Sequence, residues 1–121
     1  MKWGNRYGPE FVNRLFSSIK RHTKRPTTLF CFTDDIDGIN EEIKCRPLPE
    51  INLPEAISLT PWRKISVWQY PLDDLIGDVL FLDLDLVITG NLDRFFDYKP
   101  GNYCVIENWT QLGQNIGNTS C

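Results

Sequence analysis

The hydrophobic pattern is strongest at residues 79–82, where four large apolar side chains precede Asp83 and Asp85. An uninterrupted apolar run of this length predicts a central strand buried on both faces, as in the parallel sheets of α/β proteins. Side chains two residues apart in a strand point to the same side and lie about 6.6 Å apart along it. The two carboxylates are therefore predicted to lie together at the carboxyl end of this strand, where they could flank one divalent cation.

Three segments have the features of helices. Pro9 begins a segment whose apolar residues recur at helical spacing, which predicts a helix that ends at about His22. Thr60 as a cap and Pro61 in the first helical position predict a second helix. Residues 92–96 are expected to form one helical turn.

Shorter runs of β-branched and aromatic residues predict further strands at 27–33, 43–46 and 103–106. Strands that alternate with helices indicate an α/β layered fold, and the length suits one domain. The sequence begins just before a loop and a helix rather than with a strand, and it ends without a closing helix. We therefore expect residues 1–121 to form a single partial domain, truncated at both ends.

Composition and charge narrow the possible partners. The formal net charge of -3 argues against nucleic acid as the main partner. Basic residues cluster at 14–25, which we interpret as a solvated helix face rather than a contact with an anionic membrane. The spacing of the four cysteines matches neither a metal motif nor a disulfide scaffold, so reduced thiols are expected. With no visible signal peptide and no apolar run long enough to cross a membrane, the sequence predicts a cytoplasmic protein.

The aspartate pair permits two kinds of chemistry. A Mg²⁺ or Mn²⁺ ion held by Asp83 and Asp85 could bridge a diphosphate and neutralise its charge as it leaves. The pattern also fits the nucleophile motif of haloacid-dehalogenase-type phosphatases, in which Asp83 would attack a phosphoryl group and Asp85 would act as acid and base. The late position of the motif in the chain counts against this alternative. A third interpretation is purely structural, because aspartate is common where a strand enters a turn.

Four segments in order along the chain resemble a bacterial group of GT-A glycosyltransferases, akin to glycosyltransferase family 8. They are residues 2–12, 31–35, 62–66 and 81–93, and the last, Phe-Leu-Asp-Leu-Asp-Leu-Val-Ile-Thr-Gly-Asn-Leu-Asp, is the most specific. The resemblance implies a GT-A, Rossmann-like nucleotide-sugar-binding sheet with flanking helices. It also implies transfer of a sugar from a nucleotide sugar, expected to be UDP-linked, to a glycan or lipid-linked acceptor, as in the synthesis of bacterial polysaccharide.

By position, the resemblance assigns the metal and the diphosphate to one pair of residues. Asp83 and Asp85 match the Asp-x-Asp (DxD) motif that binds Mn²⁺ or Mg²⁺ together with the donor diphosphate, and the first Asp of this motif often also touches the ribose. Lys64 falls where the family places a basic residue near the donor.

Three further residues follow from the same resemblance. Asn118 lies where such enzymes often have a strand start that faces the donor sugar. Trp3 and Tyr7 would line the loop that receives the nucleotide base, as aromatic stacking surfaces. For both aromatic residues, packing in the core is the alternative explanation.

The sequence also departs from the family pattern. Many members carry a later histidine that completes the metal site, whereas the only histidine here is His22, which is expected to face solvent at a helix end. Residues 1–121 contain no segment that we expect to bind the acceptor. The fragment alone is therefore expected to be inactive, an inactive nucleotide-sugar-binding domain remains an alternative, and the location is expected to be the cytoplasm or the inner face of the membrane.

Overall fold

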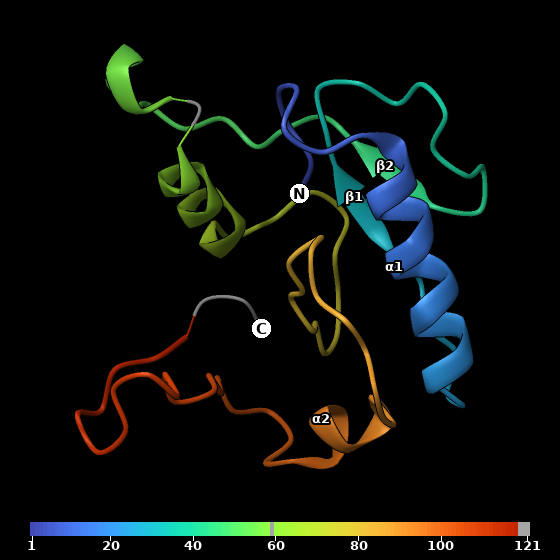
Figure 1. The fold of residues 1–121 in the computed structure, drawn as a ribbon, viewed down its shortest axis with the longest axis vertical. Helices are drawn as coiled ribbons and strands as arrows, with labels where there is room; N and C mark the ends of the chain where they lie inside the picture. Colours follow the sequence, from blue (N-terminus) through green and yellow to red (C-terminus); the bar gives the residue numbers. More distant parts are fainter. Residues whose placement is uncertain (59, 119–121) are drawn as a thin grey trace.

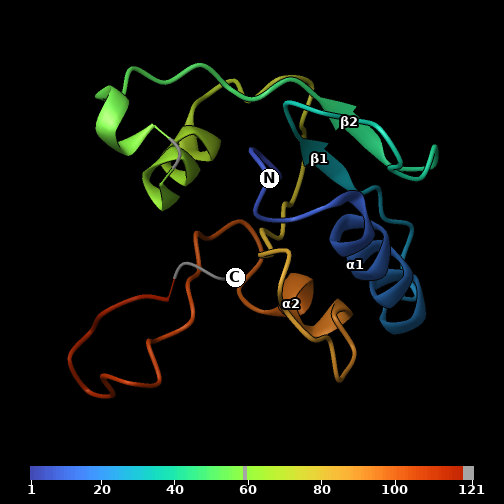
Figure 2. The same ribbon diagram turned by 45° about the horizontal axis from the view of Figure 1, so that its top comes forward.

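The computed structural model describes residues 1–58 and 60–118. In Figures 1 and 2, α1 packs beside β1 and β2, and the two short helices η1 and η2 lie away from α1. In Figure 1, α2 lies near the bottom of the view and η1 at its top. The regular elements are α1 (Pro9–His22), β1 (Phe30–Phe32), β2 (Lys44–Arg46), η1 (Glu55–Ile57), η2 (Pro61–Trp68) and α2 (Asp93–Asp97).

Helix α1 is confirmed over the range that the sequence predicts. Pro9 lies in its first turn with an acidic residue after it, and basic residues occupy its last turn, which suits the helix dipole. Val12, Leu15 and Phe16 are buried, and their spacing places them on one face. This face covers the small sheet.

The sheet is parallel and short. Strand β1 pairs with β2, with Cys31 opposite Cys45. On the opposite edge of β1, Lys2 N–H donates to Phe32 O at 2.9 Å, so Lys2 forms a single parallel bridge beside Thr33. The predicted strands at 27–33 and 43–46 are thus confirmed in position, and both are shorter than predicted.

The core lies between α1 and this sheet. Its buried members are Val12, Phe16, Cys31 and Ile43. Leu84, from the predicted DxD motif, packs against this cluster although it lies far away in the sequence. This contact brings the aspartate pair close to the amino-terminal part of the chain.

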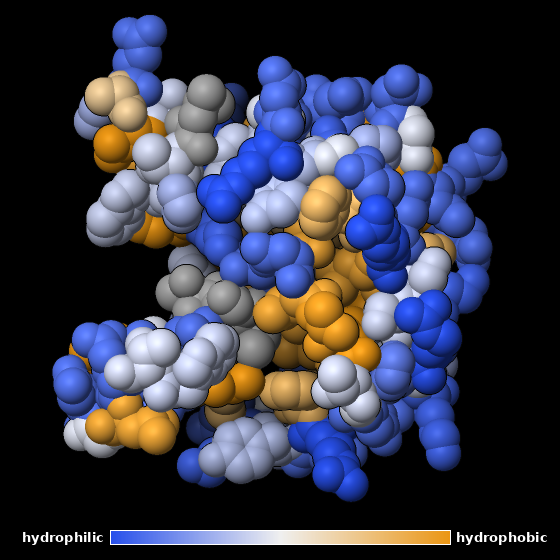
Figure 3. Space-filling view, viewed as in Figure 1, coloured by the Kyte–Doolittle hydropathy of each residue, from blue (hydrophilic) through white to orange (hydrophobic). Residues whose placement is uncertain are grey.

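The prediction of a buried central strand at 79–82 is wrong. These residues form no strand in the structure, Val79 is 62% exposed, and the chain turns at Leu84 and Asp85. A buried strand needs backbone partners, and β1 already has β2 on one edge and Lys2 on the other. Figure 3 shows apolar side chains at the surface in the middle of the molecule.

Two other predicted elements also differ from expectation. Residues 103–106 are exposed and form no strand, although Glu107 and Gly117 form an isolated antiparallel bridge nearby. Segment η2 starts at Pro61 as predicted, but it is a 3-10 helix and it ends at Trp68. Helix α2 confirms the predicted helical turn.

The wider GT-A sheet remains a prediction, because the part of the chain that the structure describes has a two-stranded sheet. Within the same residues, no helix combines the length and the apolar character needed to cross a bilayer.

Candidate functional site

A pocket of about 200 Å³ brings together three separate segments of the chain. They are the loop before α1, the first part of η2, and the turn that follows residue 82. The lining residues are Trp3, Arg6, Tyr7, Pro61, Lys64, Asp83, Leu84 and Asp85. All the predicted site residues except Asn118 therefore border one pocket.

Lys64 and Asp83 form the closest ion pair in this pocket. The Lys64 Nζ atom lies 2.6 Å from Asp83 Oδ1 and 2.7 Å from Asp83 Oδ2, so one ammonium contacts both carboxylate oxygens. The Lys64 side chain is 26% exposed and that of Asp83 is 15% exposed. Hydrogen bonds between two charged groups are roughly twice as strong as those between neutral groups, so this contact defines the resting position of Asp83.

The second carboxylate has a neutral partner. The Tyr7 hydroxyl donates a hydrogen bond to Asp85 Oδ2 at 2.8 Å. Because the Asp85 carboxylate accepts a hydrogen bond from the protonated phenol, it raises the pKa of Tyr7. The Tyr7 ring packs edge to face against Phe11 of α1, with 4.9 Å between the ring centroids. Helix α1 thus helps to fix the phenol that contacts Asp85.

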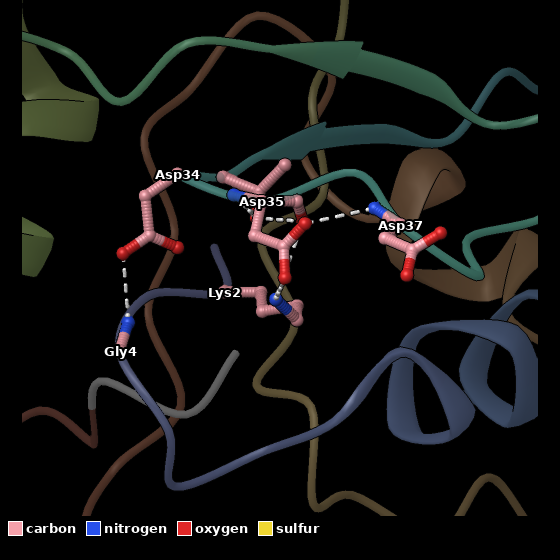
Figure 4. A network of polar contacts seen from close by, with 6 residues as sticks. Lys2, Gly4, Asp34, Asp35 and Asp37 are labelled. Carbon is pink, nitrogen blue, oxygen red and sulfur yellow. Dashed lines mark hydrogen bonds and ion pairs between the residues drawn. The ribbon is translucent and has the colours of Figure 1, made fainter.

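The loop that carries Trp3 and Tyr7 is tied to the end of β1 (Figure 4). Asp34 Oδ2 accepts the Gly4 N–H at 2.9 Å. The buried Lys2 ammonium donates to the Asp35 carbonyl at 3.2 Å and lies 3.9 Å from the Asp35 carboxylate. Asp34 and Asp35, which directly follow β1, thus hold the loop that forms one side of the pocket.

A turn at Leu84, and not a strand, brings Asp83 and Asp85 to the same pocket. Alternation along a strand was expected to bring them together, but the chain bends between them. The contact of Leu84 with the core anchors the bend, and Asp83 and Asp85 border the same pocket on either side of it.

Asp83 and Asp85 supply only part of the ligands that a divalent cation needs. Within residues 1–58 and 60–118, no group of three or more His, Cys, Asp or Glu side chains is arranged to hold a metal. Mg²⁺ is commonly held by one or two carboxylates, with substrate phosphates and water as the remaining ligands. Asp83 and Asp85 match this pattern, provided that a phosphate ligand binds with the metal.

One predicted site residue, Asn118, lies outside the pocket, and one residue of the pocket, Arg6, was not predicted. Asn118 does not line the pocket, and its backbone N–H donates to Ile106 O at 2.7 Å. Arg6 does line it, with its guanidinium 5.5 Å from the centroid of the Tyr7 ring. A signal was available in the sequence, because Arg6 is the basic residue between the two aromatic residues Trp3 and Tyr7.

A second hollow, of about 550 Å³, is larger and more open to solvent. It contains none of the predicted site residues and one charged residue of each sign, Glu50 and Arg63. We assign the candidate site to the smaller pocket, where two carboxylates face two cationic side chains. The residues of the larger hollow are Leu48, Pro49, Glu50, Ile51, Asn52 and Arg63.

Among the residues that the structure describes, no cysteine lines the pocket. Cys31, Cys45 and Cys104 are free thiols, and Cys121 lies outside the described residues. Burial raises the pKa of the Cys31 and Cys45 thiols, because a thiolate loses its hydration there. Neither thiol has the lowered pKa of a reactive cysteine.

Comparison with known proteins gives no match: no family model fits the chain, and neither a curated protein nor a solved structure is significantly similar to it.

Proposed function

We propose that the chain is the donor-binding portion of a metal-dependent glycosyltransferase. It would bind a nucleotide sugar, expected to be UDP-linked, together with Mn²⁺ or Mg²⁺. The observation that carries this proposal is the convergence of Asp83, Asp85 and Lys64 with Trp3 and Tyr7 on one pocket, from segments far apart in the sequence.

Each side chain would have a distinct part in donor binding. Asp83 and Asp85 would hold the cation, and the bound cation would stabilise negative charge on the diphosphate as it leaves. Lys64 and Arg6 supply positive charge for the phosphates, and Trp3 and Tyr7 offer aromatic surfaces to the base. The pocket is smaller than the roughly 300–1,000 Å³ of typical ligand sites, so it would take only part of the donor.

The acceptor and the location belong to the same proposal. A glycan or lipid-linked acceptor, and a place in the cytoplasm or at the inner face of the membrane, follow from the family that the four segments resemble. Asn118 as a contact of the donor sugar rests on that resemblance alone.

Calorimetric titration with UDP and UDP-sugars, in Mn²⁺ and then in a chelator, tests the proposal. We expect metal removal to weaken binding at least tenfold, about 1.4 kcal/mol or more. Asp85→Ala should abolish the metal-dependent binding, because it removes one of the two carboxylates. Asp78→Ala is the matched control, since Asp78 is an exposed carboxylate in the same segment and does not line the pocket.

Other outcomes identify the alternatives. Binding that is tight and indifferent to both the metal and Asp85→Ala would overturn the assignment. A phosphoryl group trapped on Asp83 would establish the phosphatase instead. Metal-dependent donor binding without transfer, tested with a range of acceptors on a chain that also carries an acceptor-binding region, would identify an inactive nucleotide-sugar-binding domain.

A further inference from the structure

We infer that Lys64 couples the binding of the divalent cation to the binding of the donor diphosphate. The Lys64 ammonium would stay paired with the Asp83 carboxylate until a bound diphosphate offers the ammonium another anionic partner. The inference rests on the proposed function, and it concerns how the two ligands influence each other.

The first step is competition for one carboxylate. Lys64 Nζ contacts both oxygens of Asp83, at 2.6 and 2.7 Å, so neither oxygen is free of the ammonium. A cation that binds Asp83 therefore either displaces Lys64 or shares the carboxylate with a like charge. Like charges at such short range repel each other strongly, above all where solvent is partly excluded.

The second step is the difference between the two aspartates. Asp85 is contacted by the Tyr7 hydroxyl, which is neutral, at 2.8 Å. A cation at Asp85 meets no comparable charge from this partner. Arg6 also lines the pocket, but among the described residues it is Lys64 that forms an ion pair with one of the two carboxylates, so the main obstacle to binding the cation alone lies on the Asp83 side.

The third step is the freedom of Lys64 to move. Its side chain is partly exposed, borders the pocket and has several rotatable bonds. A diphosphate in the pocket would offer the ammonium new oxygen acceptors. Lys64 would then pair with the phosphate and release Asp83 to the metal.

These steps predict a linkage between the two ligands. The cation alone should bind weakly, and the nucleotide diphosphate should increase its affinity. By thermodynamic reciprocity the cation must increase the affinity of the nucleotide by the same factor. Without the positive charge at position 64, this factor should shrink.

The decisive experiment measures Mn²⁺ binding calorimetrically, alone and at saturating UDP, in the wild type and in Lys64→Met. We expect the substitution to tighten Mn²⁺ binding in the absence of UDP by about tenfold, the effect of losing one charged hydrogen-bonded partner. It should also lower the coupling factor by about tenfold. Lys64→Arg keeps the charge and should preserve the coupling.

Controls separate this effect from a general loss of charge or of folding. Lys20→Met removes an ammonium from an exposed pair with Glu42, outside the pocket, and should leave both affinities unchanged. If Lys64→Met fails to fold, Lys64→Gln retains a hydrogen-bond donor for Asp83 and should change both quantities in the same direction.

Two failures can be told apart. If the wild type binds Mn²⁺ and UDP but the neutral variants bind Mn²⁺ no more tightly, the inference about Lys64 is wrong and the proposed function stands. If the wild type binds neither ligand, the proposed function fails and the inference fails with it.

Discussion

Cys31 is a single residue whose chemistry depends on the packing around it. Its side chain is 2% exposed and belongs to the core cluster with Val12 and Phe16. Burial raises the pKa of the Cys31 thiol, so the folded protein keeps this proton at a pH where the unfolded chain has lost it. Because the folded state then binds more protons, the free energy of unfolding must fall as pH rises above the ordinary thiol range, near 8.5.

Urea unfolding of the wild type and of Cys31→Ala, in reductant at pH 7 and at pH 9.5, tests this linkage. The wild type should lose up to about 1.4 kcal/mol per pH unit for each such thiol, and Cys31→Ala should lose less. Some dependence should remain, because burial also raises the pKa of Cys45. Cys104→Ala, at an exposed position, should retain the wild-type slope. Equal slopes for wild type and Cys31→Ala would contradict the prediction.

Among the elements, α2 is joined to the end of α1 by a small set of contacts. Leu92 N–H donates to His22 O at 2.9 Å, and the Leu92 side chain is buried. The Asp93 carboxylate accepts the Lys24 N–H at 3.1 and 3.3 Å, and it is 14% exposed. Asp93 thus satisfies a backbone donor just beyond the last turn of α1. These contacts fix the segment that follows the pocket.

Asp93→Ala should lower the free energy of unfolding by about 1–2 kcal/mol, because it removes a hydrogen bond from the Lys24 N–H to a charged acceptor and the pair of Asp93 with Arg25 at 3.8 Å. Asp97→Ala removes a carboxylate from the same helix. Asp97 pairs with Arg25 at 2.9 Å but is 66% exposed, so its loss should change stability by less than about 1 kcal/mol. Chemical denaturation of the two variants measures the difference, and a cost as large for Asp97→Ala would count against the proposed role of Asp93.

The difference between local and long-range contacts explains which elements could be predicted from the sequence. Helix α1 was predictable because the proline in its first turn and its apolar spacing are local signals. The strand expected at 79–82 was not, because a strand depends on partners that the apolar run itself does not specify. At the site, the resemblance put Lys64 and Asp83 near the same ligand, and that resemblance itself stays a prediction. The Tyr7 contact and the turn at Leu84 arise from tertiary packing and carry no signal of their own.

Across the whole molecule, packing is uneven. Within residues 1–58 and 60–118, the buried apolar side chains other than Leu92 lie between residues 12 and 43. Farther along the chain, large apolar side chains are exposed, among them Tyr70 at 99% and Ile76 at 93%. The pocket is lined both by residues of the amino-terminal part, such as Trp3 and Tyr7, and by residues of the later part, such as Asp85. A ligand bound there would contact both, and it would stabilise the less densely packed part most.

Thermal unfolding and limited proteolysis, each with and without Mn²⁺ and UDP, test this expectation. A ligand at about 100 times its Kd adds about 2.7 kcal/mol, which should raise the Tm by roughly 10 °C in a chain of this size. Cleavage within residues 79–97 should slow more than cleavage within 98–118. Asp85→Ala should show neither effect, and equal protection of both segments would contradict the prediction.

The hydrogen bond between Tyr7 and Asp85 spans 78 residues of sequence. During synthesis, which adds about 5–20 residues per second, α1, β1 and β2 leave the ribosome seconds before the second aspartate does. Trp3 and Tyr7, which line one side of the pocket, are therefore already in place when the turn at Leu84 and Asp85 packs against them. The amino-terminal part should act as the folding nucleus, and the acidic turn should be the last part of the site to be fitted in place.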